Sequence, residues 1–419
     1  MVKYSNDDNH HVLKSCQKLI HSIVRKYTGR EGFIKYRDTG AFVRELDSVV
    51  EKARNTENVL LALDIALLLL KEAIGAIQYA DDSNGDIGYL VTETLELIEE
   101  ISTDWDEIDN YRTEVFERLI AQIDHEVFEG WLDFKIDLLK ICLEFADDEI
   151  IREQLRIKMD SMLDNQSSDR SMQYSIESML QLLFQLIEQY GSQEEAEQFI
   201  HEHLQFSSFR EQLLNKYLQE KNYHKVIELA KKGETQDQKY PGLISKWKKY
   251  RYEAYLFLSL KEEQQQLAKE LLFAGNFEYY QDLKQLAQEN QREFYINIKQ
   301  ELKMKKGWNT TRIFLRLIEE ENDLEEILEF VRDDPSYIED YAEKLVNQFK
   351  EEVIEIYKSF IHSVAKTSSN RRNYQGVCHI IKKYKKIAGK LKQVELINEL
   401  MDLYKKRPAF LDELEKLKI

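Results

Sequence analysis

The sequence is poor in the two residues that tight turns require. It holds 14 glycines and 3 prolines in 419 residues, far below the average usage of about 7% and 5%. Sheets and sandwiches need many turns, which these residues supply, and proline breaks helix interiors. The shortage excludes a mainly β architecture. Together with the abundance of Leu, Glu, Lys and Gln, it predicts a chain that is mostly helical.

Cysteine is also scarce. Cys16, Cys142 and Cys378 are far apart and odd in number, which excludes a disulfide framework and a cysteine-based zinc site. This usage is typical of a reducing compartment, and the polar N-terminus lacks the apolar core of a signal peptide. We therefore expect a cytoplasmic protein.

No apolar run is long enough to cross a bilayer. The most apolar stretch, residues 59–80, is interrupted by Asp64, Lys71, Glu72 and Gln78, whereas a spanning helix needs about 20 apolar residues. We interpret this stretch as a buried core helix and expect no membrane association.

Apolar residues recur every three or four positions almost throughout, which is the helical period. Short polar breaks at residues 28–32, 81–85 and 233–241 separate segments of about 10–20 residues, as in antiparallel helix pairs. Residues 221–230 and 252–255 have the small and aromatic residues of tetratricopeptide helices, without a clean 34-residue repeat. The fold predicted is all-α, an irregular, TPR-like α-solenoid.

The net charge of −18 is unevenly distributed. Residues 81–200 hold 31 Asp+Glu and 8 Lys+Arg, and the break at residues 164–170 is the most polar in the chain. We predict an N-terminal acidic helical domain over residues 1–165 and a C-terminal TPR-like domain over residues 166–419. An acidic face repels nucleic acid, whereas a basic face attracts it.

Motifs of enzymes and metal sites are missing. The sequence has no GxSxG, GxxxxGK[ST], GxGxxG or HExxH, and His125, His362 and His379 stand alone. The acidic turn from Asp81 fails as a calcium loop, because its sixth and twelfth positions are Asp86 and Thr92. We predict a turn in which Ser83 or Asp86 caps the next helix, and expect no enzymatic activity, metal or cofactor.

A basic segment, residues 366–394, holds nine Lys or Arg and no Asp or Glu. The candidate contacts to a partner or to nucleic acid are Arg371, Arg372, Lys382, Lys383, Lys385, Lys386 and Lys390. The apolar residues predict one buried stripe: Val377, Ile380, Ile381, Tyr384, Ile387, Leu391 and Val394. Three interpretations stay open: contacts to phosphates, docking on an acidic surface of a partner or of this chain, and a solvated helix face.

Several local patterns occur together in a fixed order. They are the segments 27–37, 81–85, 273–280, 371–374 and 404–414. The series resembles the helical region that follows the zinc finger in bacterial SWIM zinc-finger proteins, over about residues 17–415. The finger itself is absent, since no two cysteines are close enough to form it. The resemblance implies a freestanding helical region and a helicase-type partner.

These observations favour a non-enzymatic scaffold or adaptor that binds a protein partner, within a DNA-processing complex. The alternative is direct nucleic-acid binding through the basic segment. A third possibility is a peptide-sensing helical-repeat regulator with an aromatic groove.

Overall fold

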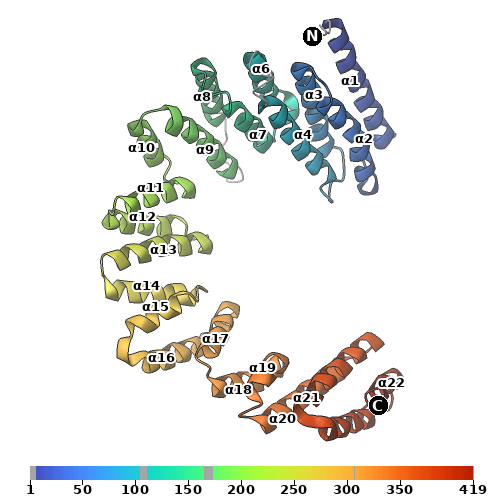
Figure 1. Cartoon of the computed structure of the whole chain (residues 1–419), viewed down its shortest axis with the longest axis vertical. Helices are drawn as coiled ribbons and strands as arrows, with labels where there is room; N and C mark the ends of the chain where they lie inside the picture. The colour runs from blue at the N-terminus through green and yellow to red at the C-terminus, as the bar shows by residue number, and fades with distance from the viewer. Residues whose placement is uncertain (1–5, 104–110, 165–172, 306, 419) are drawn as a thin grey trace. The chain divides into compact units, whose positions relative to one another are not determined.

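The regular structure is helical (Figure 1). The computed structural model describes residues 6–103, 111–164, 173–305 and 307–418. Short connections join successive helices, which pack against their neighbours in the chain. The α-helices of the described residues vary in length from 8 residues in α15 (Tyr279–Leu286) to 33 in α21 (Arg371–Leu403), with no fixed repeat length. The predicted all-α, irregular solenoid is confirmed.

The chain divides into two compact units, residues 1–213 and 214–419. The division falls inside α11 (Ser207–Gln219). The boundary predicted at residues 165 and 166 falls in residues 165–172, which lie outside the described part. The next helix, α9 (Gln173–Tyr190), packs against α7 (Leu132–Leu143) and α8 (Glu149–Asp164) within the first unit.

The first unit is built around one apolar core. Its remaining helices are α1 (Asn6–Thr28), α2 (Tyr36–Arg54), α3 (Val59–Ile77), α4 (Asp86–Thr103), α6 (Arg112–Ile123), the 3-10 helix η2 (Glu126–Phe128) and α10 (Gln193–Glu202). At its centre lies α3, where Leu63, Leu70 and Ile74 are fully buried. Asn58 starts α3 by accepting a hydrogen bond from the amide of Leu61 at 2.9 Å, which satisfies one of the free amides of the first turn. The stretch predicted as a core helix is confirmed as one.

The acidic turn before α4 is a helix cap, but its capping residue differs from the prediction. Asp82 accepts hydrogen bonds from the amides of Ile87 and Gly88, at 2.8 and 2.9 Å. Gly85 has φ of +77°, a left-handed conformation that glycine tolerates, so the chain folds back and brings Asp82 over the helix N-terminus. Asp86, one of the two predicted caps, instead accepts from the Thr39 hydroxyl at 3.1 Å.

The second unit has a separate core made largely of aromatic and aliphatic side chains. Its helices are α12 (Tyr223–Gln236), α13 (Pro241–Phe257), α14 (Lys261–Phe273), α15, η4 (Gln288–Asn290), α16 (Gln291–Met304), α17 (Trp308–Glu320), α18 (Leu324–Asp333), η5 (Pro335–Tyr337), α19 (Ile338–Leu345), α20 (Lys350–Thr367), α21 (Arg371–Leu403) and α22 (Pro408–Glu415). Tyr280, Leu317 and Ile327 are fully buried within it. Buried tyrosines of this core direct their hydroxyls to carboxylates on other helices, as Tyr280 does to Glu321 at 2.8 Å.

The tetratricopeptide-like segment forms a tightly packed helix pair. Ala230 of α12 and Ala254 and Tyr255 of α13 are buried, and the two helices pack closely against each other. Among the described residues, no helix combines the length and apolarity needed to cross a membrane.

Candidate functional site

The basic face of α21 is the first candidate site. One side of this helix is core, because Val377, Ile381 and Tyr384 are buried. On the opposite side Arg372, His379, Lys382 and Lys386 are exposed. We call these four residues the basic stripe. Their spacings of seven, three and four keep them on one helical face, over about 21 Å at 1.5 Å per residue.

Two of the predicted contact residues are held in ion pairs within the chain. Arg371 pairs with Asp412 at 2.8 Å and with Glu413 at 3.5 Å. Lys383 pairs with Glu339 of α19 at 2.9 Å. Both cations bind α21 to its neighbours, so they are less available to a partner than the sequence suggested.

Lys392, at the end of the basic segment, is also paired. Its ammonium lies 2.7 Å from a carboxylate oxygen of Glu351 on α20. The hydrogen bond and the positive charge of Lys392 lower the pKa of Glu351. This contact is on the exposed surface and adds little stability.

The other five predicted contact residues are exposed cations. They are Arg372, Lys382, Lys385, Lys386 and Lys390, and no ion pair to any of them occurs within the described part of the chain. Residues 214–419 carry 38 Lys+Arg against 34 Asp+Glu, so the unit that holds them is mildly basic. These five side chains are available to an anionic partner.

The predicted buried stripe is wrong beyond residue 388. Gly389 has φ of +87° and ψ of 169°, which breaks the helical path inside α21. The residues after this kink are rotated relative to those before it. Val394 is therefore only partly buried and Leu391 is 83% exposed, whereas Ile387, before the kink, packs against the core. An exposed leucine thus lies directly beside Lys390.

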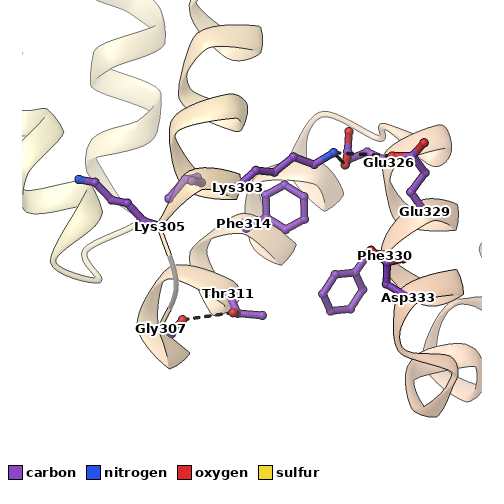
Figure 2. A pocket seen from close by; sticks show the side chains of 10 residues that line it. Lys303, Lys305, Gly307, Thr311, Phe314, Glu326, Glu329, Phe330 and Asp333 are labelled. Atoms are coloured by element: carbon purple, nitrogen blue, oxygen red, sulfur yellow. Dashed lines mark hydrogen bonds and ion pairs between the residues drawn. The ribbon is translucent and has the colours of Figure 1, made fainter.

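A pocket of about 310 Å³ between α16, α17 and α18 is the second candidate site (Figure 2). Its apolar part is formed by Leu302, Phe314 and Phe330. The rings of Phe314 and Phe330 have centroids 6.3 Å apart and are tilted by 46°. Figure 2 shows both rings directed toward the space between α17 and α18.

The acidic groups and the uncharged polar groups of this pocket come from different helices. Glu329 and Asp333 line it from α18, whereas Gly307 and Thr311 line it from the start of α17. The Thr311 hydroxyl donates to the carbonyl of Gly307 at 3.1 Å. Lys305 contributes to the wall, but its ammonium lies 4.1 Å from the ring centroid of Phe273, on α14, and Figure 2 shows it directed away from the pocket.

A network of partly buried ionic contacts holds α18 in place beside the pocket. Asp323 accepts from Tyr295 at 2.5 Å and from Lys299 at 2.7 Å. It also caps α18 by accepting from the amide of Glu326 at 3.1 Å. Burial alone would raise the pKa of Asp323, but the hydrogen bonds from Lys299, Tyr295 and the Glu326 amide outweigh it and lower that pKa.

The same network extends to the pocket wall. Lys299 lies 3.2 Å from Glu326, and Lys303 contacts Glu326 and lies 3.6 Å from Glu329. Tyr295, Lys299 and Lys303 are four residues apart on α16, so they share one face. The network fixes the position of the pocket walls before any ligand binds.

No pattern in the sequence indicates this pocket. Its residues come from three helices, and two of the helices are separated by the loop around residue 322. Each segment by itself has an ordinary amphipathic pattern. Phe314 and Phe330 are 16 residues apart in the sequence and come together only because α17 and α18 pack against each other.

The cysteines and two of the histidines are buried or in contact with other side chains. The three cysteines are buried and unpaired, and His203 stacks on Phe199 with ring centroids 4.3 Å apart. His362 lies 3.3 Å from Glu399. Within the residues that the structure covers, no group of three or more His, Cys, Asp or Glu side chains is arranged to hold a metal ion.

No protein-family model matches the chain, and the search of curated proteins found no match. Among solved structures, the chain is similar to a circular tandem repeat protein with novel repeat topology and enhanced subunit contact surfaces. The two are 15% identical over 99% of this chain and 96% of that one, with a TM-score of 0.25. That score is too low to indicate a shared fold, so the all-α assignment depends on the helices themselves.

Proposed function

We propose that this chain is a non-enzymatic helical-repeat scaffold that binds an acidic protein partner through the exposed basic face of α21. The observation that carries the proposal is the basic stripe, together with the nearby Lys385 and Lys390. Arg372 and the lysines Lys382, Lys385, Lys386 and Lys390 are exposed cations on a helix whose other face is fixed in the core. A rigid helix that presents cations along one face can recognise an acidic surface with little loss of conformational entropy.

Exposed apolar side chains on the same helix favour a protein over a nucleic acid. Leu391 is 83% exposed and Leu403 is 61% exposed, and protein interfaces combine apolar contacts with a charged rim. Glu339 and Glu351 also lie beside α21, where they pair with Lys383 and Lys392. Both lysines are therefore held against acidic neighbours and contribute less to contacts with either kind of partner.

The resemblance to the SWIM-associated helical region supports a partner that belongs to a cytoplasmic, helicase-type complex. The experiment is affinity purification of the tagged chain from its own host, with and without nuclease, read by mass spectrometry. The test variant carries Lys382→Glu and Lys386→Glu. The matched control carries Lys344→Glu and Lys350→Glu, which make the same charge change at exposed lysines of the same unit.

A protein that survives nuclease treatment, is lost from the test variant and is retained by the control supports the proposal. Equal recovery with both variants contradicts it. We expect recovery of the partner to fall as the salt concentration rises, because interactions between exposed charges are screened beyond about 8–10 Å at physiological ionic strength.

Direct nucleic-acid binding is the second candidate, because residues 366–394 contain no acid and the basic stripe is long enough to follow several phosphates. A gel shift at low salt tests it. Each phosphate contact removed from the basic stripe lowers the slope of log affinity against log salt by about one unit. No shift at low salt would exclude this candidate.

A further inference from the structure

We propose that the pocket between α16, α17 and α18 binds the guanidinium side chain of an arginine presented by a partner protein or peptide. The pocket uses no residue of α21. Its test is therefore independent of the acidic partner proposed above.

The aromatic part of the pocket suits a planar cation. Phe314 and Phe330 lie against each other with ring centroids 6.3 Å apart, so a guanidinium would stack on one face of the half-buried Phe330 and not between the two rings. Guanidinium groups stack on aromatic faces and are attracted by them. The protein already uses this attraction beside the pocket. The ammonium of Lys303 lies 6.0 Å from the centroid of Phe314.

The balance of charge around the pocket also favours a cation. Four carboxylates occur in the pocket and its network, namely Asp323, Glu326, Glu329 and Asp333. Lys299 pairs with Asp323 and Glu326, and Lys303 pairs with Glu326 and lies 3.6 Å from Glu329. Asp333 has no ion pair within the described residues. Negative charge therefore remains at the α18 side of the pocket, where Figure 2 places Glu329 and Asp333.

The size and the remaining polar groups fit one long side chain. A volume of about 310 Å³ is at the lower end of small-ligand pockets. A guanidinium stacked on Phe330 would direct its N–H groups toward the carboxylates of α18. Planar donors in a fixed fork match a carboxylate better than an ammonium does.

The experiment uses N-acetyl-arginine methylamide as the probe and N-acetyl-citrulline methylamide as its neutral isostere. Saturation-transfer NMR on the full chain suits the expected weak binding, with a Kd on the order of 1 mM for a ligand of this size. We expect citrulline to bind at least about 10-fold more weakly than arginine, because it lacks the charge.

Variants locate the site. Asp333→Asn and Phe330→Leu should each weaken arginine binding by about 3-fold or more, while Glu325→Gln, an exposed change on the same helix but outside the pocket, should not. Asp333 is exposed, so its variant should fold normally. Equal binding of arginine and citrulline, absence of saturation up to about 10 mM, or an unchanged affinity in Asp333→Asn would overturn the proposal.

Discussion

Removal of the Asp323 carboxylate should loosen the pocket walls and the hairpin of α17 and α18. This single side chain joins α16 to α18, because it accepts from Tyr295 and Lys299 of α16 and from the amide of Glu326 of α18. Both Asp323 and Lys299 have side chains that are 18% exposed. Their contact is therefore only partly screened by water.

The magnitude follows from the contacts that are lost. An N-cap contributes about 1 kcal/mol, and a hydrogen bond to a charged group contributes about 1.5–3 kcal/mol. These contributions are not additive within one network. We expect Asp323→Ala to cost about 3 kcal/mol of local stability. Asp323→Asn keeps the cap and an acceptor, so its cost should be about 1–1.5 kcal/mol.

Native-state hydrogen exchange is the appropriate assay, because it reports the opening of individual helices in a chain of two units. Amides of α16 and α18 should exchange faster in Asp323→Ala. The control Glu325→Ala removes an exposed carboxylate from the same helix and should change stability by less than about 0.5 kcal/mol. Equal exchange in Asp323→Ala and Glu325→Ala would refute this account of the network.

The same carboxylate predicts a dependence on pH. The pKa of Asp323 is lowered in the folded protein. The carboxylate therefore contributes to folding stability at pH values above its unfolded pKa of about 3.9, and this contribution is lost as the pH falls through the folded pKa. The stability difference between the wild type and Asp323→Asn should be constant near neutral pH and shrink below about pH 4. A difference that stays constant down to pH 2 would contradict the lowered pKa.

Two further predictions concern α21. Gly389→Ala should cost about 1–3 kcal/mol, because φ of +87° with ψ of 169° is a conformation essentially confined to glycine. Gly376→Ala is the control, at an exposed helical position with no atom within 4 Å of the new Cβ, and it should stabilise the protein by about 0.5–1 kcal/mol. Urea denaturation measures both variants. Equal changes in the free energy of unfolding would contradict the requirement for glycine at position 389. Burial raises the pKa of Cys378 to about 11, so its thiol should react with iodoacetamide at pH 8 about 100-fold more slowly than a free thiol. Mass spectrometry of the alkylated peptide measures this rate. When the protein is unfolded in denaturant, the rate should approach that of a free thiol.

The sequence by itself determined the helical class and many local features. The helical period placed α3 in the core and put Val377, Ile381 and Tyr384 on the buried side of α21. The shortage of glycine and proline predicted the absence of extended sheet, and the Asn-Gly pair at residues 84 and 85 marked the turn before α4. These features depend on neighbours within a few residues, so a linear pattern contains the information that specifies them.

Only the tertiary structure decided which groups are available and which are paired. Lys383 and Lys382 look equivalent in the sequence, but α19 brings Glu339 to Lys383 alone. The kink at Gly389 exposes Leu391, against the predicted stripe, and the division between units falls inside α11, where no loop composition marks it. The pocket of Phe314 and Phe330 arises from three helices. Such features depend on which helices become neighbours and on their relative rotation, and these are fixed by packing between segments that are distant in the chain.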